Sequence, residues 1–332
     1  MSLEDSTVLF APASSAAFGQ RVAAALGVPM SAPEEREFDG GEHKIRPRAS
    51  VRGRSVYIVQ CLHGDAQGSA NDRLCRLLFF VGALKDAGAR CVTLCIPYLA
   101  YARKDQRTKA RDPTTTRYVA QLIEAVGTDR IMILEAHNRA AIDNAFRIES
   151  LHLEATPYFV RHFAPVMEGA PDCVVASPDI GGVKRARHFK ESLEQGLRGK
   201  SLGVAFMDKK RSAGILSGDT LVGEVSGKQV IIIDDLISSG NTIQRTVAAC
   251  RAAGARRVDV AVSHCPFSSE AHQLFGSSGP DSVLVTDSVP LDPTFSGYLN
   301  GSLRMVSVAP LFAEAIRRLE LGGSLSELAG LE

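Results

Sequence analysis

The chain has 332 residues, about twice the length of a typical domain, so its length predicts two domains. Hydrophobic residues make up 45% and charged residues 23%, which is typical of a globular protein with a buried core. The 38 basic and 37 acidic residues leave a net charge of +1, which gives the whole molecule no attraction for nucleic acids or lipid surfaces. Any anionic ligand must therefore be bound by local basic clusters.

The first ten residues contain two acids and no apolar stretch long enough for a signal peptide. No segment approaches the roughly eighteen apolar residues of a membrane span. The seven cysteines are odd in number and scattered, and four of them lie in apolar runs, which favours reduced buried thiols over a metal site. The sequence therefore predicts a cytoplasmic protein with neither nucleic acid nor membrane as a partner.

Short apolar runs typical of strands alternate along the chain with segments of helical periodicity. Apolar residues at three- and four-residue spacing predict helices over 71–87, which Gly88 ends, and over 114–126. Asp72 lies near the start of the first helix, where the helix dipole favours an acid. The alternation predicts right-handed crossovers and mostly parallel sheets. The predicted strands are 56–60, 92–96, 131–134, 173–176, 202–206, 229–233 and 258–262.

The runs fall into two sets, with a weaker region at 148–157. We therefore expect two doubly wound domains, residues 1–153 and 154–332. A closing helix near 310–319 is placed with the second domain, although it could pack on either half. In such sheets ligands bind beyond the carboxyl ends of the strands.

The stretch "VIIIDDLISSGNTI", from Val230 to Ile243, ends a buried run with Asp234 and Asp235. The segment 238–242 that follows combines hydroxyl groups, residues that tolerate positive φ and the start of a helix, and these features together hold a phosphate. The two acids can accept hydrogen bonds from sugar hydroxyls or act through a metal ion. A sugar phosphate would use both halves of the motif. The alternative is a plain helix N-cap, but a cap needs one acid and not two.

Several segments in order resemble the ribose-phosphate pyrophosphokinase (PRPP synthetase) family over nearly the whole chain. These segments are "FDGGEHKIRP" at Phe38, "SVRGRSVYIVQ" at Ser50, "IPYLAYARKDQRT" at Ile96, "EAHN" at Glu135, "SPDIGGVKRAR" at Ser177, "MDKKR" at Met207 and "SVAPLFAEAI" at Ser307. The resemblance implies two tandem domains of the type I phosphoribosyltransferase fold. It also implies transfer of the pyrophosphoryl group of ATP to the anomeric hydroxyl of ribose 5-phosphate, which gives PRPP and AMP.

The resemblance assigns roles to individual residues. Lys209 and Arg211 match two catalytic basic residues on a mobile loop, and the polar segment 208–219 would be a lid over the site. Mg²⁺ is the implied cofactor, with His137 and Asp179 contributing to its site. The implied ATP-binding residues are Phe38, Glu42, Arg103, Lys104, Asp105 and His137. The implied ribose 5-phosphate-binding residues are Asp234, Asp235, Ser238, Ser239, Gly240, Asn241 and Thr242.

In the family the segment at Phe38 reaches the nucleotide of a neighbouring subunit, so the resemblance implies a homo-oligomer, dimer-based and up to a hexamer. Four positions depart from the family's usual pattern: Gly40, Lys104, Glu135 and Ser238. Two alternatives therefore remain, a PRPP-using phosphoribosyltransferase and a catalytically weak homologue that regulates an active synthetase. The sequence leaves open the oligomer order, allosteric control and the donor nucleotide.

Overall fold

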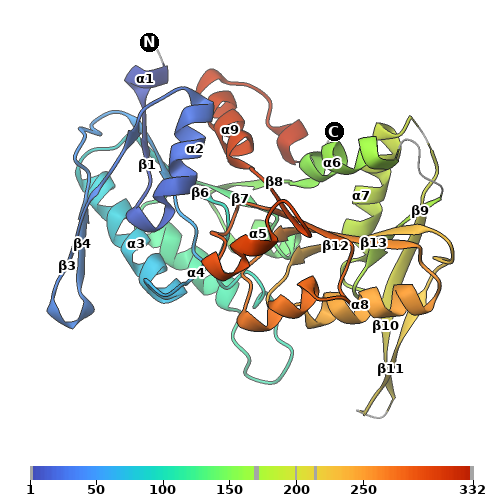
Figure 1. The fold of residues 1–332 in the computed structure, drawn as a ribbon. Coiled ribbons are helices and arrows are strands. Elements are labelled where there is room, and N and C mark those ends of the chain that lie inside the picture. The colour runs from blue at the N-terminus through green and yellow to red at the C-terminus, as the bar shows by residue number, and fades with distance from the viewer. Residues whose placement is uncertain (1–2, 168–171, 199, 213–214, 330–332) are drawn as a thin grey trace. The chain divides into compact units, whose positions relative to one another are not determined.

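The computed structural model describes residues 3–167, 172–198, 200–212 and 215–329, without the side chains of 209–219, 327 and 329. The chain divides into two compact units (Figure 1). Unit 1 comprises Met1–Glu154 and Val308–Glu332, and unit 2 comprises Ala155–Ser307. None of the described helices is long and apolar enough to cross a lipid bilayer.

Unit 1 is built on a six-stranded sheet in the order β2-β1-β5-β6-β7-β8, with parallel pairing throughout. Its strands are β1 (Thr7–Phe10), β2 (Met30–Ser31), β5 (Ser55–Val59), β6 (Cys91–Ile96), β7 (Arg130–Leu134) and β8 (Glu149–Leu153). The helices are α1 (Leu3–Ser6), α2 (Ala16–Leu26), α3 (Ala70–Asp86), α4 (Thr115–Ala125), α5 (Arg139–Ala145) and α9 (Ala309–Leu321). The strands predicted for this unit, 56–60, 92–96 and 131–134, and the helices predicted over 71–87 and 114–126, are confirmed to within one residue at each end.

The order of the strands explains which helices share a face. From β5 to β8 each crossover moves to the next strand in one direction, so right-handed connections put α3, α4 and α5 on the same face. Their apolar sides form one core with alternate residues of the strands, including Phe10 and Ile58. The crossover from β1 to β2 runs the other way and puts α2 on the opposite face.

The face that carries α2 is completed by α9, which returns from the far end of the chain. The rings of Phe18 and Phe312 meet edge to face with centroids 5.7 Å apart. The buried Tyr57 donates a hydrogen bond to Glu320 at 2.8 Å, and Arg317 donates to the carbonyl of Ala25 at 3.1 Å. The expectation that residues 154–332 form one domain is therefore wrong for its last segment, because α9 buries its apolar side in unit 1.

Unit 2 is built on a seven-stranded sheet in the order β11-β10-β9-β12-β13-β14-β15, parallel except for the pair β10–β11. Its strands are β9 (Cys173–Ser177), β10 (Gly203–Ser212), β11 (Ile215–Val222), β12 (Gln229–Leu236), β13 (Arg257–His264), β14 (Ser282–Thr286) and β15 (Leu303–Val306). One face carries α8 (Asn241–Ala252) with the short helices η3 (Ser269–Phe275) and η4 (Pro293–Tyr298). Helices α6 (Thr156–Met167) and α7 (Val183–Gly196) pack against each other through Phe163 and Phe189.

The strand order of unit 2 reverses between β9 and β12. The chain leaves β9 through α7 toward β10, and it leaves β12 through α8 toward β13, in the opposite direction. Such a reversal opens a crevice at the carboxyl ends of the two strands, where doubly wound folds bind their ligands. A ligand site of this kind would lie beyond Ser177, the end of β9, and beyond Ile232, the last residue of β12 that pairs with β9.

The predicted lid, 208–219, is not an irregular loop. Its ends lie in the antiparallel strands β10 and β11, whose register shifts between Lys209 and Arg211. Residues 213–214 lie outside the described residues. Antiparallel pairing fits the segment because the backbone groups of two polar strands can hydrogen-bond to each other.

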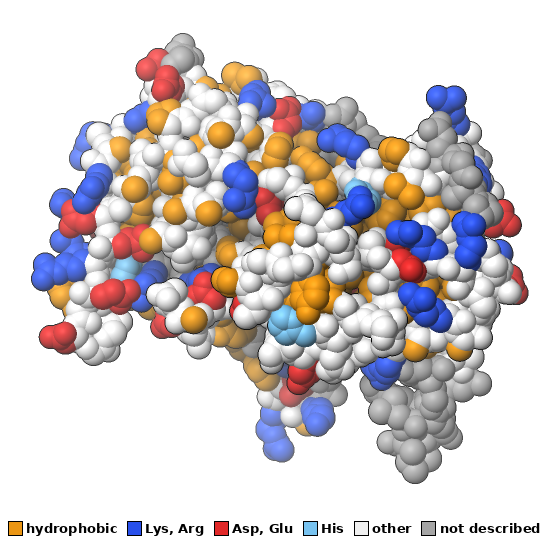
Figure 2. Space-filling model, viewed as in Figure 1, with side chains coloured by type: hydrophobic (Ala, Val, Ile, Leu, Met, Phe, Trp, Pro, Cys, Tyr) orange, Lys and Arg blue, Asp and Glu red, His pale blue; other side chains and the backbone are white. Residues whose placement is uncertain are grey.

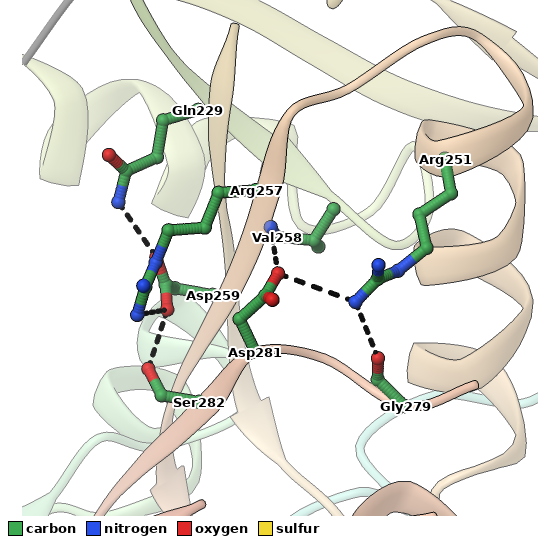
Figure 3. A network of polar contacts seen from close by, with 8 residues as sticks. All are labelled: Gln229, Arg251, Arg257, Val258, Asp259, Gly279, Asp281 and Ser282. Atoms are coloured by element: carbon green, nitrogen blue, oxygen red, sulfur yellow. Dashed lines mark hydrogen bonds and ion pairs between the residues drawn. The ribbon is translucent and has the colours of Figure 1, made fainter. Parts of the chain in front are cut away.

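The opposite, amino-terminal edge of the unit 2 sheet is held by a polar network (Figure 3). The buried Asp259 accepts hydrogen bonds from Gln229 at 2.8 Å, from Arg257 at 2.8 and 2.9 Å, and from Ser282 at 2.6 Å. These residues lie at or near the starts of β12, β13 and β14. The network therefore ties three strands together far from their carboxyl ends.

Replacing Asp259 with alanine is expected to lower the free energy of unfolding by about 2–4 kcal/mol, because a buried glutamine, an arginine and a serine lose their shared acceptor. Urea unfolding measures the change. Asp281→Ala on the same edge is the matched control. Its carboxylate is more exposed and accepts from Val258 and Arg251, so a loss of about 1 kcal/mol is expected there. Equal losses in the two variants would contradict the role given to Asp259.

Candidate functional site

The acid pair Asp234–Asp235 lies at the reversal of strand order in unit 2. The last residue of β12 paired with β9 is Ile232, so both acids extend past that neighbour while β12 continues beside β13 to Leu236. The expectation that they follow the strand is corrected in this detail, since both are within it. Arg185 from α7 places one guanidinium nitrogen 3.2 Å from a carboxylate oxygen of each acid. The basic group partly offsets the repulsion between them.

Burial and the neighbouring charge of Asp235 raise the pKa of Asp234 to about 8, although Arg185 acts in the opposite direction. The pair thus tends to hold one proton between two carboxylates. A group that brings positive charge or hydroxyl donors to this edge, such as a metal ion or a sugar, would favour the ionised form.

The raised pKa predicts how stability depends on pH. An aspartate in an unfolded chain titrates near about pH 4, so between about pH 4 and pH 8 the folded state keeps a proton that the unfolded state has lost. The free energy of unfolding must therefore fall as pH rises through this window. The free energy of unfolding of Asp234→Asn is expected to fall less steeply with pH than that of wild type. At pH 8 the variant should be more stable than wild type by about 1–3 kcal/mol. Urea unfolding across the window measures this, and parallel pH profiles would contradict it.

The segment Ser238–Thr242 forms the turn from β12 into α8. Its backbone is fixed at two points, since Ile237 donates to the carbonyl of His264 and Ser268 donates to that of Ser238. Gly240 is the N-cap of α8, with φ of 79°, and it offers no side-chain acceptor to the first-turn N–H groups. Those N–H groups carry the positive end of the helix dipole, which attracts a phosphate.

Glycine is required at position 240 for two reasons. Positive φ costs a residue with a side chain energy. In addition, a Cβ at this position would lie 2.7 Å from Leu274 Cδ1 and Cγ, which is too close. The turn is therefore packed tightly on η3, and its backbone has little freedom to move.

Asp179 lies in the turn after β9, on the other side of the same crevice. Its Oδ1 accepts a hydrogen bond from the Gly182 N–H at 3.0 Å, and its carbonyl accepts one from Ser177 at 2.7 Å. These bonds orient the carboxylate at the start of α7. Unit 2 thus gathers Asp179, Arg185 and the acid pair at the carboxyl ends of β9 and β12.

In unit 1, four of the predicted nucleotide residues come from two adjacent turns at the carboxyl edge of the sheet: Arg103, Lys104, Asp105 and His137. His137 is exposed in the turn after β7, and its neighbour Asn138 donates to Asp105 in the loop after β6 at 2.8 Å. The turn is anchored where the buried His152 accepts from the Ala136 N–H at 2.9 Å. Glu135, where the family usually has aspartate, is buried and has a φ of 43°.

The loop between β6 and α4 contains Arg103, Lys104 and Asp105. Arg103 is exposed, whereas the Lys104 ammonium lies 2.9 Å from Oδ2 of Asp112. The loop also hydrogen-bonds to its own helix, since the Thr116 N–H donates to the Lys104 carbonyl. Arg103 is therefore available to an anion, while Lys104 has a partner within its own loop.

Phe38 and Glu42 lie at the tip of a two-stranded hairpin formed by β3 (Glu34–Glu37) and β4 (His43–Arg46). The hairpin extends away from the unit 1 sheet (Figure 1), and Figure 2 shows acidic and basic side chains interspersed over it. Phe38 is 41% exposed, with the Arg36 guanidinium 4.9 Å from its ring centroid. Gly40 and Gly41 both have positive φ at the tip, which explains why a glycine suits position 40.

The structure brings the turns of Asp105 and His137 together in unit 1, and Asp179 and the acid pair to adjacent strand ends in unit 2, whereas Phe38 and Glu42 lie apart on the hairpin. Lys209 and Arg211 lie in β10, but their side chains are outside the described residues. Their roles, like those of the other predicted site residues, stay predictions. Sequence reasoning missed Arg185, Asp112 and Asn138 as partners of site residues. The only signals for them were that Arg185 and Asn138 stand within the segments that carry the family resemblance.

The chemistry of the donors at the unit 2 edge fits Mg²⁺, which prefers carboxylate oxygens and water. Among the described residues, no group of three or more His, Cys, Asp or Glu side chains is arranged to hold a metal ion. A Mg²⁺ ion that relies on one or two carboxylates and on substrate phosphates needs no such cage. Asp179 and the acid pair supply carboxylates of this kind, whereas imidazole suits Mg²⁺ less well, which weakens the prediction for His137.

Comparisons with known proteins cover nearly the whole chain. The family profile described as the N-terminal domain of ribose phosphate pyrophosphokinase matches residues 7–127. The profile described as the phosphoribosyl synthetase-associated domain matches residues 200–329. The ribose-phosphate pyrophosphokinase of Wolinella succinogenes is 34% identical over 312 residues, covering 94% of this chain and 95% of that protein. That of Fusobacterium nucleatum is 34% identical over 321 residues, covering 96% and 97%.

A solved structure agrees with these sequence matches. The crystal structure of phosphoribosylpyrophosphate synthetase from Mycobacterium smegmatis is similar with a TM-score of 0.85 and 32% identity, over 96% of this chain and 99% of that one. The predicted architecture of two tandem, mostly parallel α/β domains is thereby confirmed. Similarity of this extent in both sequence and fold shows that the chain belongs to the ribose-phosphate pyrophosphokinase family.

Proposed function

We propose that this protein transfers the pyrophosphoryl group of Mg²⁺-ATP to the anomeric hydroxyl of ribose 5-phosphate, forming PRPP and AMP. The observation that carries the proposal is the acid pair of β12 followed directly by the glycine-capped start of α8, at the strand reversal of unit 2. A helix N-terminus suits the 5-phosphate, and carboxylates suit the sugar hydroxyls. The two features lie in consecutive segments, as one phosphorylated pentose requires.

The reaction joins the anomeric oxygen to the β-phosphorus of ATP and breaks the bond between that phosphorus and the oxygen shared with the α-phosphate. Negative charge builds up on phosphate oxygens during this transfer, so fixed positive charges accelerate it. We assign this role to Lys209 and Arg211 of β10. Mg²⁺ would supply further positive charge at the phosphates, with Asp179 as its protein ligand.

In unit 1 we assign the nucleotide to the carboxyl edge that carries Arg103, Asp105 and His137. The exposed ring of Phe38 and the carboxylate of Glu42 suit an adenine ring and its amino group. Because the hairpin that bears them extends away from its own sheet, we propose that it serves a neighbouring subunit in a homo-oligomer. Location in the cytoplasm stays a prediction.

The test mixes the purified protein, MgCl₂, ATP and ribose 5-phosphate and follows the products by ³¹P NMR. Formation of AMP and PRPP in equal amounts supports the proposal. ADP as the nucleotide product would show transfer of a single phosphoryl group and contradict it. Consumption of PRPP with a nucleobase and without ATP would identify a phosphoribosyltransferase. No turnover, followed by activation or inhibition of an added active synthetase, would identify a regulator.

A further inference from the structure

The loop between β6 and α4 contains an ion pair and hydrogen bonds that converge on one carboxylate oxygen. Oδ2 of Asp112 accepts from the Lys104 ammonium at 2.9 Å, from the Thr108 hydroxyl at 2.7 Å, and from the N–H groups of Thr108 and Lys109 at 3.1 and 3.0 Å. These hydrogen bonds hold the pKa of Asp112 well below its usual range. The carboxylate thus joins the two ends of the loop, Lys104 and Asp112, which are eight positions apart in the chain.

The closed loop is also connected to its surroundings on both sides. On one side, the Lys104 N–H donates to the Tyr101 carbonyl, and the Lys104 carbonyl accepts from Thr116 at the start of α4. On the other side, the next residue, Asp105, accepts from Asn138 beside His137. Because Lys104 lies between Arg103 and Asp105, fixing its two ends fixes the backbone that presents both neighbours.

We propose that Asp112 is a positioning residue for nucleotide binding and that Lys104 acts through it rather than on the nucleotide. The pair, which we call the Lys104–Asp112 clamp, orders the loop so that Arg103 and Asp105 meet Mg²⁺-ATP without first losing conformational freedom. A preordered loop binds its ligand more tightly because this entropy has already been spent on folding. The inference rests on the proposed function and reassigns the predicted role of Lys104.

The first experiment measures loop order without any ligand. Hydrogen exchange of the full-length protein reports on the Thr108 and Lys109 amides, which donate to Asp112. Asp112→Asn weakens the acceptor and is expected to speed exchange of this loop by about tenfold or more. Unchanged exchange would overturn the clamp, whatever the protein catalyses.

The second experiment separates binding from chemistry. Asp112→Asn is expected to raise KM for Mg²⁺-ATP by about tenfold, while kcat and KM for ribose 5-phosphate change by less than about threefold. In a double-mutant cycle with Lys104→Gln, the second substitution should add little to the first, because both break one clamp. If Lys104 instead contacts the nucleotide, Lys104→Gln has the larger effect and the two effects multiply. That outcome would overturn the proposal.

The chain offers a matched control in the Lys85–Asp129 pair. Its ammonium and carboxylate are also 2.9 Å apart and similarly exposed, and Asp129 also accepts a backbone N–H, that of Val92. Asp129 immediately precedes β7, so this pair lies at the amino edge of the same sheet. Asp129→Asn should leave KM for ATP unchanged. A rise equal to that of Asp112→Asn would mean that general loss of stability, and not positioning, explains the effect.

Failure of the clamp and failure of the proposed function give different results. Binding of Mg²⁺-α,β-methylene-ATP, which cannot release AMP, is measured by titration calorimetry. If wild type binds this analogue more tightly than Asp112→Asn but forms no PRPP, the clamp stands and the proposed function fails. If PRPP forms and the two proteins bind the analogue equally, the clamp is wrong and the proposed function stands.

Discussion

Replacing Lys209 with alanine is expected to lower kcat by about 10³-fold, with a similar loss for Arg211→Ala, because each removes a positive charge from phosphates that gain negative charge in the transition state. KM for ribose 5-phosphate should change little, since that substrate is assigned to the turn before α8. Steady-state rates of AMP formation measure both parameters. The combined variant should lose less than the product of the two single losses, because residues that stabilise one transition state act together.

The control for these substitutions is Lys210→Ala. Lys210 stands between the two residues in β10 and has the same charge as Lys209, so its removal changes the net charge and the strand equally. The family resemblance assigns Lys210 no role, so this variant should lose less than about threefold in kcat. Comparable losses in all three variants would show that the strand needs basic residues in general, and would contradict the assignment.

Gly240→Ala is expected to lower kcat/KM for ribose 5-phosphate by about 30- to 300-fold, which corresponds to roughly 2–3.5 kcal/mol. Two causes combine. Alanine at φ of 79° is strained, and its Cβ would lie 2.7 Å from Leu274. The turn must shift to relieve the contact, and the N–H groups at the start of α8 then no longer converge on the 5-phosphate.

Gly227→Ala separates strain from the contact. Gly227 also has a positive φ, 69°, but a Cβ there would meet nothing within 4 Å, and the residue lies just before β12, at the amino edge of the sheet. This variant should lose about 1 kcal/mol of stability and keep its kcat/KM. Titration of Gly240→Ala with inorganic phosphate provides a second measurement. Unchanged phosphate affinity would contradict the placement of the 5-phosphate at this turn.

Much of the fold could be predicted because apolar periodicity reports directly on burial. The strands 131–134 and 173–176 and the helix 71–87 agree with the structure closely, since each buries a continuous apolar surface. The C-terminal helix was assigned to the wrong domain because an apolar stripe shows that a helix is buried but not what it is buried against. The strands within the predicted lid were missed because its polar sequence contains no apolar run, and these strands pair with each other.

The candidate site could be predicted where its residues follow one another in a single segment of suitable residue types, as Asp234, Asp235 and Gly240 do. Its supporting residues could not. Arg185 meets the acid pair from a helix about fifty positions earlier, and Asp112 holds Lys104 across a loop without regular structure. Contacts of this kind depend on the tertiary fold, and no spacing of residues in the sequence predicts them.

The return of α9 to unit 1 determines the order in which the protein can mature on the ribosome. Unit 2 is translated in full before the residues that cover Tyr57 and Phe18 leave the exit tunnel. Until then, the apolar face of the unit 1 sheet that α9 will cover stays exposed beside α2. This face can aggregate with other proteins while unit 2 is being synthesised. Unit 1 therefore cannot finish folding before unit 2 has been translated, because it needs α9 to complete its core.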